Sequence, residues 1–319
     1  MALKGGQFKR WMVTGAAALL LSACAFQTGV NPTLKPIGRP DAAALPLPDV
    51  AQPTSQESAR LRSYFNQVQQ AQLSQGLLRS DGGGPDTPYT AEMLARNFEQ
   101  IAFYNEYNAS FSGRGEKTLM RRWDQPVRMA VVFGDSVPPS TRETDGAAVR
   151  AYAGRLSGIT GHPITLRGDP NFMVIIAGED DREAALVQAA QRIPGVTPAS
   201  LSALRNLRRD TYCIVAAYAG GPDPSTYTAA VAVIRAENPS LMRLSCIHEE
   251  LAQGLGLAND SPTARPSIFN DDDEFALLTR HDEDLLKILY DPRLKAGMSA
   301  EQAAPIVRTI ARELTGGPL

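Results

Sequence analysis

The spacing of apolar residues differs between the N-terminal and the later parts of the chain, and the first regular spacing is that of a helix. Between Leu61 and Leu73 they recur at intervals that predict a helix over 56–79. Thr90 stands where it would cap a second helix with an apolar face of its own. Residues 54–115 are therefore expected to form a helical segment that precedes the sheet-forming part of the chain.

From residue 127 onwards, short runs rich in Val, Ile and Ala alternate with amphipathic segments. The runs predict strands and the amphipathic segments predict helices. The expected strands are 127–133, 164–166, 172–177, 212–218 and 229–234, and the expected helices are 144–159, 181–193, 198–208 and one from Ser240 to about Leu257. This order predicts an α/β (α+β) fold with a mixed sheet of about five strands, a backing helix and the helix that begins at Ser240. The N-terminal helices precede this part of the chain, and a C-terminal helix is expected over 293–319.

The first residues are typical of an export signal. Lys4, Lys9 and Arg10 precede an apolar run that is far shorter than the ~20 residues of a membrane-spanning helix. The run ends in Leu-Ser-Ala-Cys24, which resembles the lipobox of bacterial lipoproteins. The resemblance implies a signal peptide over residues 1–23 and a lipid on Cys24 that anchors the protein to a membrane. An ordinary signal with a chance cysteine is the alternative.

Residues 24–53 are expected to be the lipid anchor and a tether. They carry prolines among small and polar residues, a composition typical of an extended spacer. Ala25, not Asp, follows the cysteine. By resemblance to the sorting rules of Gram-negative lipoproteins, this implies the outer membrane, with the protein facing the periplasm. The periplasmic side of the inner membrane is the alternative.

Composition narrows the partners and the redox compartment. The net charge of −2 gives no electrostatic reason to expect nucleic acid as a partner. Besides Cys24, the chain has only Cys213 and Cys246, an even pair in an oxidising compartment. We expect them to form a disulfide whose loop of about 33 residues contributes roughly 3–4 kcal/mol in the chain-entropy model. Two buried free thiols are the alternative.

The segment His248–Asp260 carries the most candidate chemistry. On a helix, Glu249 and Gln253 share one face because they lie four residues apart, and Glu250 lies about 100° further round. A separate apolar stripe faces the predicted core and consists of Leu244, Ile247, Leu251 and Leu255. Two glycines after Gln253 permit a sharp exit from the helix.

This segment resembles the zinc motif of matrixin-like metzincin peptidases, H-E-x-x-H-x-x-G-x-x-H. Glu249, Gln253 and Asn259 stand where that motif has its three zinc-binding histidines. Glu250 stands at the general-base Glu, which makes it a candidate vestigial base, and Gly256 stands at the Gly. The resemblance implies a zincin-like domain over residues 116–292. The chain also resembles an uncharacterised family of proteobacterial envelope lipoproteins that contains this motif.

Two downstream segments resemble further parts of the same peptidases. Pro266–Asn270 is similar to the Met-turn, with Phe269 in the place of the Met. Asp282–Tyr290 is similar to the closing helix of the metzincin domain.

The substituted positions change the expected chemistry. Zinc favours His, Cys or carboxylate, whereas Gln and Asn offer neutral carbonyl oxygens that suit harder cations. Without zinc, the bound water whose pKa the metal lowers is lost as well. We therefore expect no zinc and no other cofactor. An ion such as Ca²⁺ or Mg²⁺, held there with the help of Asp260 or by the acidic run 271–274 with Asn270, is the alternative.

The histidines do not restore a zinc site in another register. His248 begins an H-E-x-x pattern, but Ala252 occupies its fifth position. A three-histidine site would need His162, His248 and His281 together, and these are the only histidines of the chain. Each is more commonly a core or surface residue. The acidic residues after His281 fit the N-terminus of a helix, where carboxylates favour the helix dipole.

Three functions fit these patterns. The first is an inactive metzincin-like module that binds an unidentified periplasmic protein or peptide, or scaffolds one. The second is a peptidase-like hydrolase that uses Glu249 and Glu250 as a carboxylate pair or with an oxygen-ligated metal. Adjacent positions on a helix diverge, which argues against that pair. The third is a structural envelope component in which the motif survives because it packs well.

Overall fold

The computed structural model describes residues 54–104, 117–197 and 200–316. The predicted signal peptide, Cys24 and the tether lie outside these residues. Within the described ranges, no helix combines the length and apolar character that crossing a membrane requires. All of these described residues belong to one compact unit.

The predicted mixed sheet of five strands is present. Its strands are β1 (Val127–Phe133), β2 (Ile164–Thr165), β3 (Phe172–Ala177), β4 (Cys213–Tyr218) and β5 (Ala229–Arg235). Their order across the sheet is β2-β1-β3-β5-β4, and every neighbouring pair is parallel except β4 with β5. The central strands β3 and β5 are buried at every position, as expected for strands covered on both faces.

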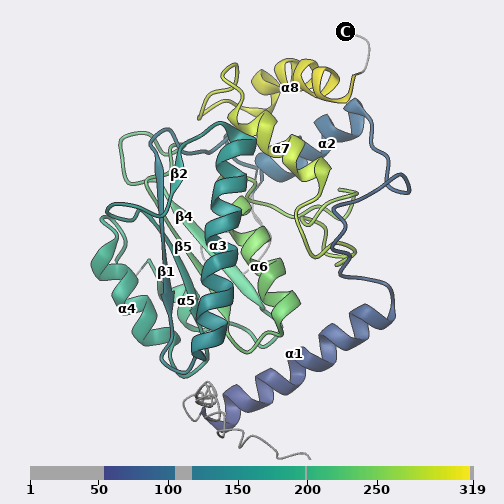
Figure 1. The fold of residues 1–319 in the computed structure, drawn as a ribbon. Helices are drawn as coiled ribbons and strands as arrows, with labels where there is room; N and C mark the ends of the chain where they lie inside the picture. The colour runs from purple at the N-terminus through teal and green to yellow at the C-terminus, as the bar shows by residue number, and fades with distance from the viewer. Residues whose placement is uncertain (1–53, 105–116, 198–199, 317–319) are drawn as a thin grey trace, which may run out of the picture. The chain divides into compact units, whose positions relative to one another are not determined.

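Helices cover both faces of the sheet (Figure 1). Those described are α1 (Gln56–Ser74), α2 (Ala91–Ala102), α3 (Pro139–Thr160), α4 (Arg182–Arg192), α5 (Ser202–Arg205), α6 (Ser240–Gln253), α7 (Arg280–Tyr290) and α8 (Ala300–Thr315). The larger core joins one sheet face to α2, α3, α6, α7 and α8. The smaller core joins the other face to α4 and α5. The fold therefore has three layers with the predicted motif helix α6 in one of the outer layers.

The observed helix ends differ from the predicted ones for local reasons. α1 ends at Ser74, before the predicted residue 79, because Gly76 adopts a left-handed φ of 77°. The helix predicted at 198–208 is reduced to α5. The chain leaves the helical conformation at Asn206, which has a φ of −111° and a ψ of 67°. The guanidinium groups of Arg182 and Arg235 then donate to the carbonyl oxygens of residues 205, 207 and 208.

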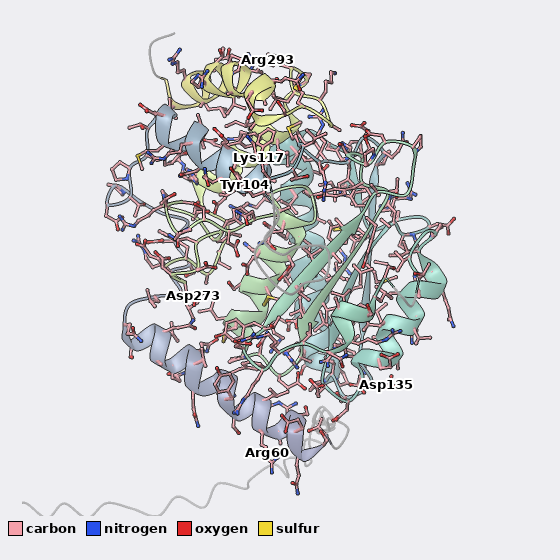
Figure 2. The ribbon with its side chains drawn as sticks, turned by 180° about the vertical axis from the view of Figure 1, so that it is seen from behind. Arg60, Tyr104, Lys117, Asp135, Asp273 and Arg293 are labelled. Atoms are coloured by element: carbon pink, nitrogen blue, oxygen red, sulfur yellow. A yellow bond between two sulfur atoms is a disulfide. The ribbon has the colours of Figure 1, made fainter. Side chains whose placement is uncertain are left out.

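The two N-terminal helices pack onto the sheet-forming part. α2 contributes Leu94, Phe98 and Ile101, all fully buried, to the larger core. α1 packs Leu61 and Phe65 against Met242 at the start of α6. At its other end Gln72 donates to the carboxylate of Asp273, which Figure 2 shows beside that end of α1. α1 therefore bridges the motif helix and the acidic run at 271–274.

Candidate functional site

The motif helix α6 buries the predicted apolar stripe. Ile247, Leu251 and Leu255 are fully buried, and Leu244 is half-buried. The helix ends at Gln253, earlier than the predicted Leu257. Leu255 and Gly256 donate instead to carbonyls three residues back, so the chain leaves α6 in a tight turn.

Two glycines and two aromatic residues fix this exit. A side chain on Gly254 would meet the Phe172 ring at 2.5 Å, and one on Gly256 would meet the Arg121 carbonyl oxygen at 2.3 Å. Gly256 also has a φ of +129°, which only glycine adopts readily. Trp123 Nε1–H donates to the Gly254 carbonyl and the Tyr290 hydroxyl donates to the Leu255 carbonyl, each at 2.9 Å. Close packing explains why glycine stands at these positions.

His248 points into the core. Its ring stacks on Tyr152 with centroids 4.0 Å apart, and its Nδ1 accepts from the Leu278 N–H at 3.1 Å. Burial, assisted by the charge of Arg155, lowers the pKa of His248 to about 3. The imidazole is therefore neutral at physiological pH and serves as a core residue.

Gln253 and the residues after the helix exit lie together. Gln253 Nε2 donates to the Asp260 carboxylate at 3.0 Å. Asn259 Nδ2 donates to the main-chain carbonyls of Asp260 and of Gln100 on α2. Asp260 thus contacts Gln253, and the amide nitrogens of Gln253 and Asn259 are both engaged in hydrogen bonds.

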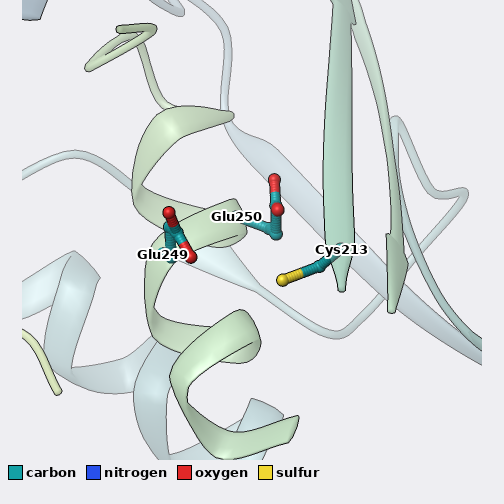
Figure 3. Close-up of side chains that lie close together, drawn as sticks. All are labelled: Cys213, Glu249 and Glu250. Atoms are coloured by element: carbon teal, nitrogen blue, oxygen red, sulfur yellow. The ribbon is translucent and has the colours of Figure 1, made fainter. Parts of the chain in front are cut away.

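Glu249 and Glu250 come closer than their angular separation predicted. One carboxylate oxygen of each and the Cys213 sulfur all lie within 4.8 Å of one another, as Figure 3 illustrates. Glu250 is buried and Glu249 is half-buried. Both carboxylates therefore lie near the Cys213 sulfur, at the start of β4. This is the one group of three such residues near enough to share an ion among the residues that the structure describes.

The expected disulfide is confirmed. Cys213 at the start of β4 bonds to Cys246 on α6, with a Cα–Cα distance of 5.8 Å. The bond fastens the edge strand to the motif helix one turn before Glu249 and Glu250. It also occupies the Cys213 sulfur, so this sulfur does not act as a thiolate ligand beside the two carboxylates.

The segment compared with a Met-turn is a tight, buried turn. Phe269 is fully buried, and its carbonyl accepts from the Ser261 N–H. Asp282 holds the turn, because its carboxylate accepts from the Ser267 hydroxyl and from the Ile268 N–H. Asp282 also closes a capping box with Thr279 at the start of α7. Sequence analysis assigned Asp282 only to a helix start; the Thr-x-x-Asp spacing was the available signal.

The remaining acidic residues and histidines lie in separate local networks. Glu274 pairs with Arg79 and Arg265, and burial raises the pKa of Asp273. His281 is fully buried against Asn97, and His162 bonds to the Gln125 carbonyl. Within the described residues, none of the three histidines belongs to a group that could share an ion.

A protein-family model described as "Protein of unknown function (DUF2927)" matches residues 91–309, more than half of the chain. The chain belongs to the DUF2927 family. The DUF2927 segment contains the whole sheet and the helices from α2 to α7, with most of α8, whereas α1 precedes it. Neither the curated proteins nor the solved structures include a match to this chain.

Proposed function

We propose that the protein is a lipoprotein of the bacterial envelope whose metzincin-like domain binds a periplasmic protein or peptide without cleaving it. The lipid on Cys24 anchors it to the outer membrane, facing the periplasm, and the tether over residues 24–53 carries the folded unit. The inner membrane remains the alternative anchor.

The donor atoms at the three ligand positions are the main support for the absence of zinc chemistry. The donors at the three ligand positions are a carboxylate on Glu249 and the amides of Gln253 and Asn259, and the neighbouring imidazole of His248 is stacked in the core on Tyr152. Two neutral amide oxygens and one carboxylate do not fit zinc, which needs nitrogen, sulfur or several carboxylates. Bringing His248 to this face would require α6 to turn and the buried stack to break.

The binding surface that we assign lies along β4 and α6. β4 is the last strand in the sheet order, so its outer edge pairs with no strand among the described residues. An extended peptide can add to such an edge through main-chain hydrogen bonds. The disulfide holds this edge beside α6, where the half-buried Glu249 favours a basic ligand residue.

The test measures zinc and cleavage on the mature protein prepared without chelators. We expect far less than one zinc per chain by elemental analysis, and no cleavage of a mixed peptide library. A binding partner recovered by cross-linking from the β4–α6 face should be lost when Val215 on β4 is replaced by Pro. One tightly held zinc per chain, or peptide cleavage that a chelator abolishes, would overturn the proposal.

The proximity of Glu249 and Glu250 favours hydrolysis as the second candidate. Two carboxylates within 4.8 Å, one buried and one half-exposed, have unequal surroundings, which is how such pairs divide acid and base roles. If this candidate is right, a screen of peptides and envelope glycans reveals an activity that Glu250→Gln abolishes while the melting temperature is retained. An activity that survives Glu250→Gln would exclude this pair.

A further inference from the structure

β2 leaves most of the neighbouring strand β1 uncovered. β2 has two residues, which pair with Val127 and Arg128, whereas β1 continues to Phe133. On its other side β1 pairs with β3 from Met129 to Phe133. The β2-side edge of β1 is therefore open along its second half among the residues that the structure describes.

The direction of the main-chain groups on this open edge follows from the bonds at the two ends of β1. The Arg128 carbonyl accepts from Asn171 and the Gly134 N–H donates to Ile176, so even-numbered residues bond toward β3. The Val127 N–H bonds to Pro163, on the side of β2. Because strand residues alternate, Val131 and Phe133 present their N–H and C=O groups to the open edge.

A groove of about 500 Å³ lies beside this edge, between β1 and α3. Figure 1 shows α3 running alongside β1. The floor is apolar and includes Val131, Phe133 and Leu166. On α3, small residues keep the groove open: Gly146 lies close to the Phe133 ring, and Ala147 is exposed. β1 from Met129 to Phe133 is roughly 13 Å long, which suits four or five extended residues.

The groove has a basic end and an acidic end. The short connection from β1 makes α3 run back along the strand, so Arg150 lies toward Leu166 and Glu143 lies beyond Phe133. The guanidinium of Arg142 donates hydrogen bonds to the main-chain carbonyls of residues 134, 135 and 137. Arg150 is exposed, and its guanidinium has no hydrogen bond or ion pair within the described part of the chain.

We propose that this groove binds the C-terminal end of an extended peptide, which adds to β1 as a strand antiparallel to it. The peptide's main chain bonds to Val131 and Phe133, an apolar side chain sits on the floor, and the terminal carboxylate meets Arg150. The site lies at the opposite edge of the sheet from β4, and the proposal stands independently of the function proposed above.

Hydrogen exchange tests the open edge in the free protein. The amides of Val131 and Phe133 should exchange at least tenfold faster than those of Ala130 and Val132, which bond toward β3. Equal protection along β1 would overturn the proposal, because it would mean that the edge is already bonded.

A peptide array tests the ligand. The probes are hexapeptides of alternating apolar and polar residues, attached through their N-termini, each with a free carboxylate or a terminal amide. We expect the wild-type protein to bind a subset of the peptides with free carboxylates, and to bind their amide forms at least tenfold more weakly. Arg150→Ala should bind the same carboxylate peptides at least tenfold more weakly than the wild type, and Ala147→Trp should not bind them. Ala71→Trp, at an exposed alanine on α1, is the matched control and should bind normally.

The outcomes separate this site from the face at β4. Bound peptide should protect the amides of Val131 and Phe133 from exchange, and Val215→Pro on β4 should leave array binding unchanged. Binding that persists in Ala147→Trp, or an array on which no carboxylate peptide binds, would contradict the proposal while leaving the function assigned to β4 and α6 untouched.

Discussion

The buried state of His248 predicts a specific pH dependence of stability. Folded His248 has a pKa of about 3, against an ordinary value of 6.5. Below pH 6.5 the His248 imidazole takes up a proton in the unfolded chain but not in the folded chain. The contribution of His248 to the free energy of unfolding is therefore fully present above pH 6.5 and is lost as the pH falls toward 3. At 1.36 kcal/mol per pKa unit, the loss between pH 7 and pH 5 from this residue is about 2 kcal/mol.

Urea unfolding at pH 7 and pH 5 measures this loss. His248→Asn removes the titrating group and keeps an acceptor for the Leu278 N–H. Between pH 7 and pH 5, the free energy of unfolding of this variant should fall by about 2 kcal/mol less than that of the wild type. The carboxylates are common to both proteins and cancel in the comparison. Tyr152→Phe keeps the stacked ring and should retain the wild-type pH dependence. An identical pH dependence in wild type and His248→Asn would refute the burial of a neutral imidazole.

Three further predictions concern the frame of the site. Replacing Cys213 and Cys246 together by Ser should lower the free energy of unfolding by about 4 kcal/mol, since the 33-residue separation enters the chain-entropy model logarithmically; an unchanged urea midpoint would contradict this. Gly256→Ala should destabilise by at least about 2 kcal/mol, because the methyl group meets the Arg121 carbonyl at a strained φ. The control is Gly158→Ala, in open space on α3, which should raise the melting temperature slightly. Equal melting temperatures of Gly256→Ala and Gly158→Ala would contradict this reasoning. Asp282→Ala should release the turn at Ser267 and Ile268 and cost about 3 kcal/mol, whereas Asn should recover part of it; a melting temperature unaffected by Ala would be the contrary result.

Periodicity predicted the sheet and most helices because burial on a layer imposes a regular pattern on β3, β5 and α6. It failed where side chains from elsewhere decide the ending. α5 ends at Arg205, and the segment that follows is held by Arg182 and Arg235, which donate to the carbonyl oxygens of residues 205, 207 and 208. No local pattern near Ser202 indicates these distant arginines. The open edge of β1 was not predicted, because periodicity does not give the order of the strands, which places the short β2 beside β1.

At the site, the cysteine pairing could be predicted because few cysteines leave few choices. The approach of Glu249 to Glu250 could not, since it depends on side-chain conformations rather than on helical angles. The role of Asp282 in holding the turn around Phe269 was missed for a related reason. A helix cap is a local signal, whereas its bonds to Ser267 and Ile268 cross fifteen and fourteen residues of sequence.

Zinc titration of two proteins in parallel tests the central claim most directly. The wild type should show no stoichiometric binding by calorimetry, and the triple variant Glu249→His, Gln253→His and Asn259→His should take up one zinc per chain, because the metzincin comparison places these three positions around one metal. Tight zinc binding by the wild type would contradict the loss of the metal. A triple variant that folds but binds no zinc would show that these three positions do not converge.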